Sequence, residues 1–181
     1  MKKLLILIIL AGLCYYIYNI AKPDVPQDYN KLKASFHTQL IKQTKAPQDY
    51  LPLYDAPGVK KILYPSGKYQ LQALLSTVNI DTTKRKAAVV FLHAGFALGA
   101  SDITDCQSFI NEDYIVMAPS YRAENGNDGK FELFMGEVDD AKAAVKWLSK
   151  QSYVDSTRIY VIGHSIGGGI ASMLSLQKVQ N

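Results

Sequence analysis

A serine flanked by glycines is the first place in this sequence where chemistry could occur. Gly163-His164-Ser165-Ile166-Gly167 matches the pattern G-x-S-x-G, in which the serine hydroxyl attacks a carbonyl carbon and forms an acyl intermediate. The pattern requires a buried strand before the serine and a helix after it, because a sharp, strained turn between them exposes the hydroxyl. Side chains at positions 163 and 167 would collide with the neighbouring strand and helix. The sequence therefore predicts Ser165 as a nucleophile and Gly163 and Gly167 as the glycines of its turn.

The second candidate segment is His93-Ala94-Gly95-Phe96, which directly follows the apolar run 87–92. A serine nucleophile of this kind needs two N–H groups that bind the oxygen on which negative charge develops. One N–H comes from the residue after the serine, here Ile166. The other comes from the loop after the third strand, here from Phe96 or Gly95. We therefore expect the oxyanion hole to be built from Ile166 and from Phe96 or Gly95.

The elements that must position these residues alternate between strand and helix. Two extended stretches separated by Pro65-Ser66-Gly67-Lys68 indicate an antiparallel hairpin, and three later apolar runs indicate buried strands. Apolar residues spaced three and four apart predict the amphipathic helices. This alternation predicts an α/β fold with a mostly parallel sheet and helices on both faces. The expected strands are 60–64, 69–78, 87–92, 114–118 and 158–162, and the expected helices are 101–111, 134–150 and 166–179.

Residues 59–179 resemble the first half of α/β-hydrolases related to the catalytic domain of the prolyl oligopeptidase (peptidase S9) family of serine peptidases. The matching phrases are FLHAGF at 91–96, MAPSYR at 117–122, GEVDD at 136–140 and RIYVIGHSIGG at 158–168. The resemblance implies a serine hydrolase that cleaves a peptide or ester bond through a Ser165 acyl-enzyme, without a metal or an organic cofactor. It also suggests that Arg122 and Glu137 shape the surroundings of the site, although an internal salt bridge or a solvated face is the simpler expectation.

The general base and the carboxylate that orients it follow the serine in this class, in the order serine, acid, histidine. The 16 residues after Ser165 contain no Asp, Glu or His. We expect His93 to hold its loop by hydrogen bonding, His164 to point away from the site, and His37 to lie in a tether. Because a serine without a base is a poor nucleophile, we expect the 181-residue chain to be weakly active or inactive alone.

Two hypotheses of different kinds stay open at this point. In the first, the chain is the N-terminal part of a serine hydrolase that acts on a small ester or a peptide. In the second, it is a non-catalytic remnant, or a subunit that needs a separate chain to complete the sheet. The strand at 158–162 is mostly apolar, and without a further strand beside it its N–H and C=O groups would form an unpaired edge.

The N-terminus is typical of a targeting segment. Lys2 and Lys3 precede an apolar run from Leu4 to Ala21, which as a helix would span about 27 Å, close to the roughly 30 Å hydrocarbon layer. An uncleaved signal-anchor, a cleaved signal peptide and a lipid-modified Cys14 each place the folded part outside the cytoplasm. A buried core helix is the remaining alternative. We expect membrane contact through residues 1–21, a Pro-punctuated tether over 22–57 and an α/β-hydrolase domain over 58–181.

Composition and charge exclude other classes of protein. With 48% hydrophobic and 20% charged residues, the chain is globular rather than disordered. Its net charge is +4, but it has no block of five or more basic residues, so nucleic-acid binding has no support. Cys14 and Cys106 fall in neither a C-x-x-C nor a metal-ligand spacing, so we expect neither a disulfide nor a metal site.

Overall fold

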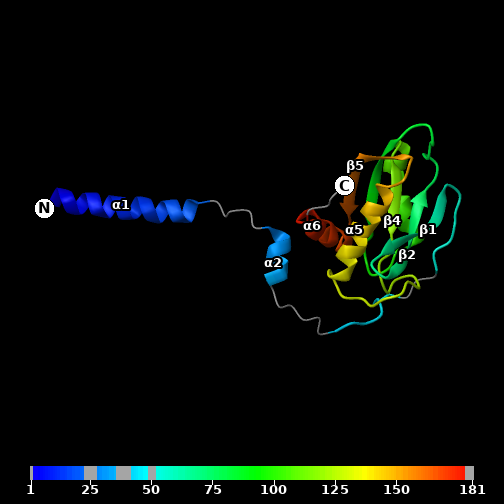
Figure 1. The fold of residues 1–181 in the computed structure, drawn as a ribbon, viewed down its shortest axis with the longest axis horizontal. Coiled ribbons are helices and arrows are strands. Elements are labelled where there is room, and N and C mark those ends of the chain that lie inside the picture. Colours follow the sequence, from blue (N-terminus) through cyan, green and yellow to red (C-terminus); the bar gives the residue numbers. More distant parts are fainter. Residues whose placement is uncertain (1, 23–27, 36–41, 49–51, 178–181) are drawn as a thin grey trace. The chain divides into compact units, whose positions relative to one another are not determined.

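The N-terminal part of the chain forms a compact unit of its own. The structure, a computed structural model, describes residues 2–22, 28–35, 42–48 and 52–177, and the chain divides into the units Met1–His37 and Thr38–Asn181. The first unit contains helix α1 (Lys2–Ala21) and the short helix α2 (Tyr29–Ser35) (Figure 1). Over the residues that are described, no helix is both long enough and apolar enough to cross a membrane.

The second unit is built around a five-stranded sheet with helices on its faces (Figure 1). The strand order is β1-β2-β4-β3-β5, so the strand that precedes Ser165 lies at one end. Its strands are β1 (Val59–Ser66), β2 (Tyr69–Ser76), β3 (Lys86–Leu92), β4 (Ile115–Pro119) and β5 (Val154–Gly163). Its helices are α3 (Ala100–Asp105), α4 (Gln107–Asn111), α5 (Gly136–Leu148) and α6 (Ile166–Ser175).

The sheet is mixed. β1 pairs antiparallel with β2, and β2 pairs antiparallel with β4, whereas β3 runs parallel to both β4 and β5. The parallel strands are joined by helical crossovers and the antiparallel pair β1–β2 by a tight turn, as the connection lengths require. The predicted α/β fold is confirmed. Its parallel part is confined to β4, β3 and β5, because the N-terminal hairpin joins the sheet through β4.

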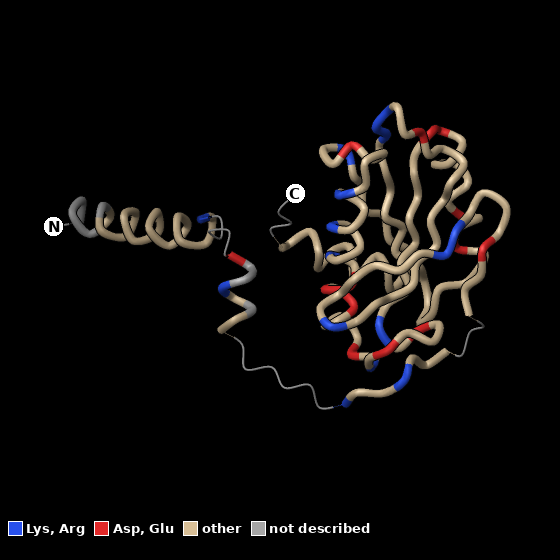
Figure 2. Tube along the Cα trace, turned by 45° about the vertical axis from the view of Figure 1, so that its right-hand side comes forward, with Lys and Arg blue, Asp and Glu red and all other residues tan. Residues whose placement is uncertain are grey.

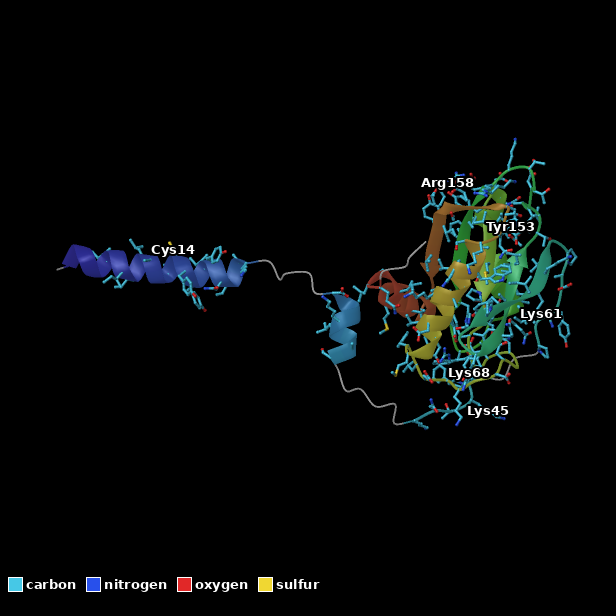
Figure 3. All side chains as sticks on the ribbon, viewed as in Figure 1. Cys14, Lys45, Lys61, Lys68, Tyr153 and Arg158 are labelled. Atoms are coloured by element: carbon cyan, nitrogen blue, oxygen red, sulfur yellow. The ribbon has the colours of Figure 1, made fainter. Side chains whose placement is uncertain are left out.

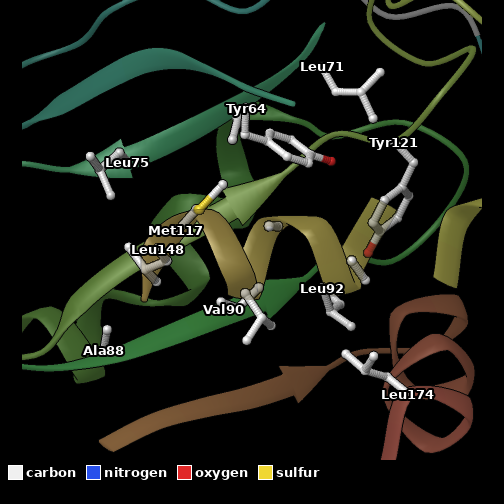
Figure 4. Close-up of a cluster of buried hydrophobic side chains, with 14 of the residues drawn as sticks. Tyr64, Leu71, Leu75, Ala88, Val90, Leu92, Met117, Tyr121, Leu148 and Leu174 are labelled. Carbon is white, nitrogen blue, oxygen red and sulfur yellow. The ribbon is translucent and has the colours of Figure 1, made fainter. Parts of the chain in front are cut away.

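Strand β3 separates two apolar clusters, because its side chains alternate between the faces of the sheet. Ala88, Val90 and Leu92 are fully buried on the face that α5 and α6 cover, together with Met117 (Figure 4). Val89 and Phe91 lie on the other face, with residues of α3 and α4. A strand buried on both faces reads as a continuous apolar run, which is why residues 87–92 were recognisable from the sequence.

The helix expected over 101–111 is broken at Cys106, where α3 ends and α4 begins. The Cys106 thiol is buried in the cluster on this face, and burial raises its pKa to about 12. Its position is that of a small apolar core residue. Cys14, by contrast, is exposed on α1 (Figure 3). Both cysteines are free thiols.

Part of the stretch that precedes β1 belongs to the second unit and packs into it. The side chain of Leu53 is 5% exposed and belongs to the cluster beneath α3 and α4. Ala46 is also buried, and Thr44 forms an antiparallel bridge with Phe131. Basic and acidic residues are interspersed over the surface of this unit (Figure 2). Part of the segment expected to be a tether is thus packed against the strands and loops that follow it.

Candidate active site

Ser165 lies at the turn between β5 and α6. It is the residue before the first turn of α6 and has φ 52° and ψ −116°, a conformation that a residue with a Cβ rarely adopts. Its side chain is exposed. The sequence prediction placed this serine at a strained strand-to-helix turn, and the structure places it there.

The two glycines of the motif lie where backbone segments pack closely together. A Cβ on Gly163 would lie 2.1 Å from the carbonyl oxygen of Gly167, and one on Gly167 would lie 2.0 Å from the carbonyl oxygen of Leu92. The first contact is with the helix and the second with the end of the neighbouring strand β3. His164 N–H also donates to the Leu92 carbonyl at 3.1 Å. The turn can approach β3 this closely only because both positions lack a side chain.

The loop after β3 carries the other predicted residues. Gly95 has φ 69°, in the left-handed region that favours glycine, whereas Ala94 does not have a positive φ. Position 94 can hold an alanine because the left-handed residue of this loop is the next one. The N–H of Phe96 donates to the side-chain carbonyl oxygen of Gln48 at 2.5 Å. Ile166 is the first residue of α6, and the first four N–H groups of a helix have no acceptor within it.

His93 holds this loop from inside the protein. Its ring is fully buried and stacks on Tyr121 at a centroid distance of 4.8 Å. Nε2 lies 3.0 Å from Oε2 of Glu124, and Nδ1 lies 2.9 Å from the carbonyl oxygen of Ala94. Both ring nitrogens are therefore engaged away from Ser165. These contacts agree with the prediction from the sequence that His93 holds its loop by hydrogen bonding.

Glu124 and Asn125 connect the loop after β4 to the loop after β3. Glu124 also accepts the N–H of Tyr121 at 3.0 Å. Asn125 accepts the N–H of Leu98 at 3.0 Å and donates to the Leu98 carbonyl at 2.8 Å. Both side chains are buried. Sequence reasoning did not assign them a role in positioning residues 93–98, and the only local signal, a positive φ at Asn125, cannot be seen in the sequence.

The His93–Glu124 pair makes stability depend on pH. Burial lowers the pKa of His93, but the hydrogen bond and charge of Glu124 outweigh it, with smaller contributions from the Ala94 carbonyl and Asp102, so the pKa is raised. Its stabilising contribution is then complete below the usual pKa of about 6.5 and is lost as the pH rises through the raised value. We expect the free energy of unfolding, from urea titrations between pH 6 and 9, to fall with pH. Glu124→Gln should remove this dependence of the unfolding free energy on pH. His164→Gln, a substitution at an exposed position, is the control and should keep it. An unchanged pH dependence in Glu124→Gln would contradict the role assigned to the pair.

Arg122 belongs to an internal ion pair. Its guanidinium donates to both carboxylate oxygens of Asp140, at 2.8 and 2.9 Å, and its backbone N–H donates to Asp140 at 2.9 Å. The hydrogen bond with Asp140 raises the pKa of Arg122. Glu137 is buried, accepts the Glu132 N–H at 2.8 Å, and has its pKa raised by burial. For Arg122, the expectation of an internal salt bridge is confirmed.

The Ser165 hydroxyl has no hydrogen-bond partner among the residues that the structure describes. His37 lies outside them. In the same residues, no group of three or more His, Cys, Asp or Glu side chains is placed to hold a metal ion. The site thus presents an exposed serine at a strained turn, with the N–H groups of Ile166 and Phe96 carried by the two adjoining elements.

Several solved structures share this arrangement of strands and helices. Esterase Pf2001 of Pyrococcus furiosus is 24% identical with a TM-score of 0.57, over 71% of this chain and 49% of that chain. This similarity is one of fold. The Pyrobaculum calidifontis esterase is 28% identical with a TM-score of 0.51, over 67% of this chain and 39% of that one. The carboxylesterase EstE1, cloned from a metagenomic library, is 25% identical with a TM-score of 0.53, over 71% of this chain and 42% of that chain. These likenesses are to esterases and give the peptidase S9 branch no support.

Sequence comparison adds two relatives and a family. The uncharacterized protein Rv2307c of Mycobacterium tuberculosis is 41% identical over 63 residues, which are 35% of this chain and 22% of that protein. The uncharacterized protein RP471 of Rickettsia prowazekii is 33% identical over 69 residues, 38% of this chain and 29% of that protein. The chain thus spans under a third of these relatives and about half or less of the esterases. The BD-FAE family model matches residues 78–181, more than half of the chain, so this protein belongs to the BD-FAE family and carries part of an α/β-hydrolase fold.

Proposed function

We propose that Ser165 is the nucleophile of a serine esterase. Its oxygen attacks the carbonyl carbon of a carboxylic ester, the bond to the alcohol breaks, and the serine proton leaves through a base to the departing alcohol. Water then attacks the acyl-serine, which releases the carboxylic acid and returns the proton to Ser165. The observation that carries the proposal is the strained backbone of an exposed Ser165 at the N-terminus of α6.

The negative charge that forms on the carbonyl oxygen needs two donors. We assign them to the N–H groups of Ile166 and Phe96, with Gly95 allowing the loop to turn toward the site. An ester rather than a peptide is proposed because the similar structures are esterases. Cleavage of a peptide bond, which the resemblance to peptidase S9 implies, is the alternative substrate of the same site.

The experiment uses a fluorophosphonate, whose phosphorus forms a bond to the serine oxygen while fluoride leaves and the proton passes to a base. In the described residues no base hydrogen-bonds to the Ser165 hydroxyl, so we expect the 181-residue chain to be labelled slowly. Added imidazole supplies a base and should accelerate labelling at least tenfold, since general-base catalysis contributes about 10²–10⁴-fold where the base is well placed. Peptide mapping of the adduct by mass spectrometry identifies the residue.

Ser165→Ala should abolish this labelling and any hydrolysis of p-nitrophenyl acetate that exceeds the rate with imidazole alone. Ser172→Ala is the matched control, because Ser172 is an exposed serine of α6, the helix that follows Ser165. Its labelling rate should stay within about twofold of wild type. Equal labelling of Ser165→Ala and wild type would refute the proposal. Rapid labelling without imidazole would show instead that the chain supplies its own base.

A second candidate is a subunit that another polypeptide completes. β5 is a terminal strand of the sheet and pairs with β3 alone in the part of the chain that is described. Hollows lined mainly by apolar residues lie on both of its faces, one beside α6 and one beside Tyr114 and Phe109. An added strand would cover the edge and could carry the acid and the base. Absence of labelling at Ser165 with imidazole present would favour this candidate or a non-catalytic chain.

We also propose that the folded part acts outside the cytoplasm. The support is the sequence pattern of two lysines followed by an apolar run, which helix α1 comprises. Expression with a C-terminal tag, followed by separation of the cytoplasmic, membrane and external fractions, tests this localisation. Recovery of the chain in the cytoplasmic fraction alone would contradict it.

A further inference from the structure

The side chain of Gln48 lies against the proposed oxyanion hole. Its carbonyl oxygen accepts the N–H of Phe96 at 2.5 Å, and the same oxygen lies 2.6 Å from where a Cβ on Gly95 would be. A carboxamide oxygen is an acceptor of the same kind as the carbonyl oxygen of an ester. The donor that we assign to the substrate is therefore already occupied by a group of this chain that resembles it.

Gln48 is carried by a segment that is fixed to the domain at several points. We call residues 42–48 the strap (Figure 3 labels Lys45 on it). Thr44 and Phe131 exchange two backbone hydrogen bonds, with N–O distances of 2.8 and 3.4 Å, and Gln43 donates to Oε1 of Glu132 at 3.0 Å. The ring of Phe131 packs edge-on against that of Phe96 at a centroid distance of 5.4 Å. The strap and the candidate oxyanion loop thus contact the same residue, the strap through the Phe131 backbone and the loop through the Phe131 ring.

We propose that the strap is autoinhibitory, with Gln48 acting as an internal mimic of the substrate carbonyl. The inference rests on the proposed function of Ser165 and adds a form of regulation to that site. One N–H offers one well-aligned position to an acceptor, so an ester carbonyl can reach the Phe96 N–H only after Gln48 has left it. Because Gln48 is tethered to the domain, it competes at a high effective concentration.

The strap is suited to local release. Its contacts are mostly polar, and of its seven residues only Ala46 is buried. Segments with few buried apolar contacts open at low free energy while the rest of a domain stays folded. A polar hollow of about 340 Å³, lined by Lys45, Gln48 and residues of the loop 123–129, lies beside it.

The test compares the labelling of Ser165 by a fluorophosphonate, with imidazole present, in Gln48 variants. A net hydrogen bond of this kind corresponds to about a 2- to 12-fold equilibrium effect, so Gln48→Ala should be labelled about 2 to 12 times faster than wild type. Gln48→Glu retains an acceptor and adds a negative charge, which strengthens the hydrogen bond to the Phe96 N–H. We therefore expect it to be labelled more slowly than wild type. The Phe96 amide should exchange hydrogen faster in Gln48→Ala and slower in Gln48→Glu.

Gln107→Ala is the matched control, because Gln107 is an exposed glutamine whose side chain makes one surface hydrogen bond, to Asn111. Its labelling rate should equal that of wild type. If Ser165 is labelled but Gln48→Ala reacts no faster than wild type, the autoinhibitory strap is overturned and the proposed nucleophile stands. If none of the variants is labelled, the proposed function fails and the strap proposal fails with it.

Discussion

Gly167→Ala is expected to destabilise the domain by about 3 kcal/mol or more, which is at the upper end of the cost of overpacking. The new Cβ would lie 2.0 Å from the Leu92 carbonyl oxygen and 2.7 Å from that of His93. Both are backbone atoms at the end of β3, so no side chain can rotate away to make room. Relief requires α6 to move off the sheet or β3 to shift, and either movement disturbs the core around Leu92 and Ile170. Urea denaturation followed by circular dichroism measures the loss.

Gly168→Ala is the control for this experiment, because it makes the same change one residue further along α6. A Cβ there would lie 3.4 Å from the Gly163 carbonyl oxygen, at ordinary contact distance. Alanine is favoured over glycine in a helix by roughly 1 kcal/mol, so this variant should be as stable as wild type or more stable. Equal stabilities of the Gly167 and Gly168 variants would show that the turn at Ser165 does not pack against β3 as described.

Asp140→Ala should destabilise the domain by about 3–5 kcal/mol, because removal of one member of a buried ion pair leaves the other uncompensated. The Asp140 carboxylate is fully buried and accepts hydrogen bonds from the Arg122 guanidinium and backbone, and from Ser66 at 2.6 Å. After the substitution, the guanidinium, which is 14% exposed, would keep the Glu132 carboxylate at 3.6 Å and the Tyr69 ring, 5.4 Å from its centroid, but no close carboxylate partner. The pair therefore connects the start of α5, the end of β1 and the loop after β4.

Asp139→Ala is the matched comparison for Asp140→Ala. Asp139 is the preceding residue of the same helix turn, and its side chain is exposed. Its contribution is limited to the favourable position of a negative charge near a helix N-terminus, about 0.3–1 kcal/mol. A difference of less than about 1 kcal/mol between the two variants in urea unfolding would argue against a structural role for the buried pair.

The candidate site depends on both buried networks. The His93–Glu124 pair and Asn125 hold the loop that presents the Phe96 N–H, and the Arg122–Asp140 pair holds the loop from which Glu124 and Asn125 project. A change in either network should therefore alter the geometry of the oxyanion donors before it alters Ser165 itself. Positioning of the donor, more than exposure of the nucleophile, is the property that these polar contacts maintain.

The sequence by itself determined the elements and the turn that carries Ser165. Alternating strand and helix patterns predicted the α/β fold, and the spacing of Gly163, Ser165 and Gly167 predicted a strained turn, because both signals are local. Apolar runs and periodic spacing depend on neighbours within one strand or helix. A glycine requirement of this kind likewise depends on backbone geometry over a few residues.

Only the tertiary structure decided which segments meet. The position of β5 at the end of a mixed sheet, and the contact of Gln48 with the Phe96 amide 48 residues later, involve partners far apart in the chain. The sequence around Gln48 carries no motif, and Glu124 and Asn125 are polar residues that a surface loop would contain equally well. Their roles arise because folding buries them beside N–H and C=O groups that need partners. That requirement is set by the packed environment and not by the local sequence.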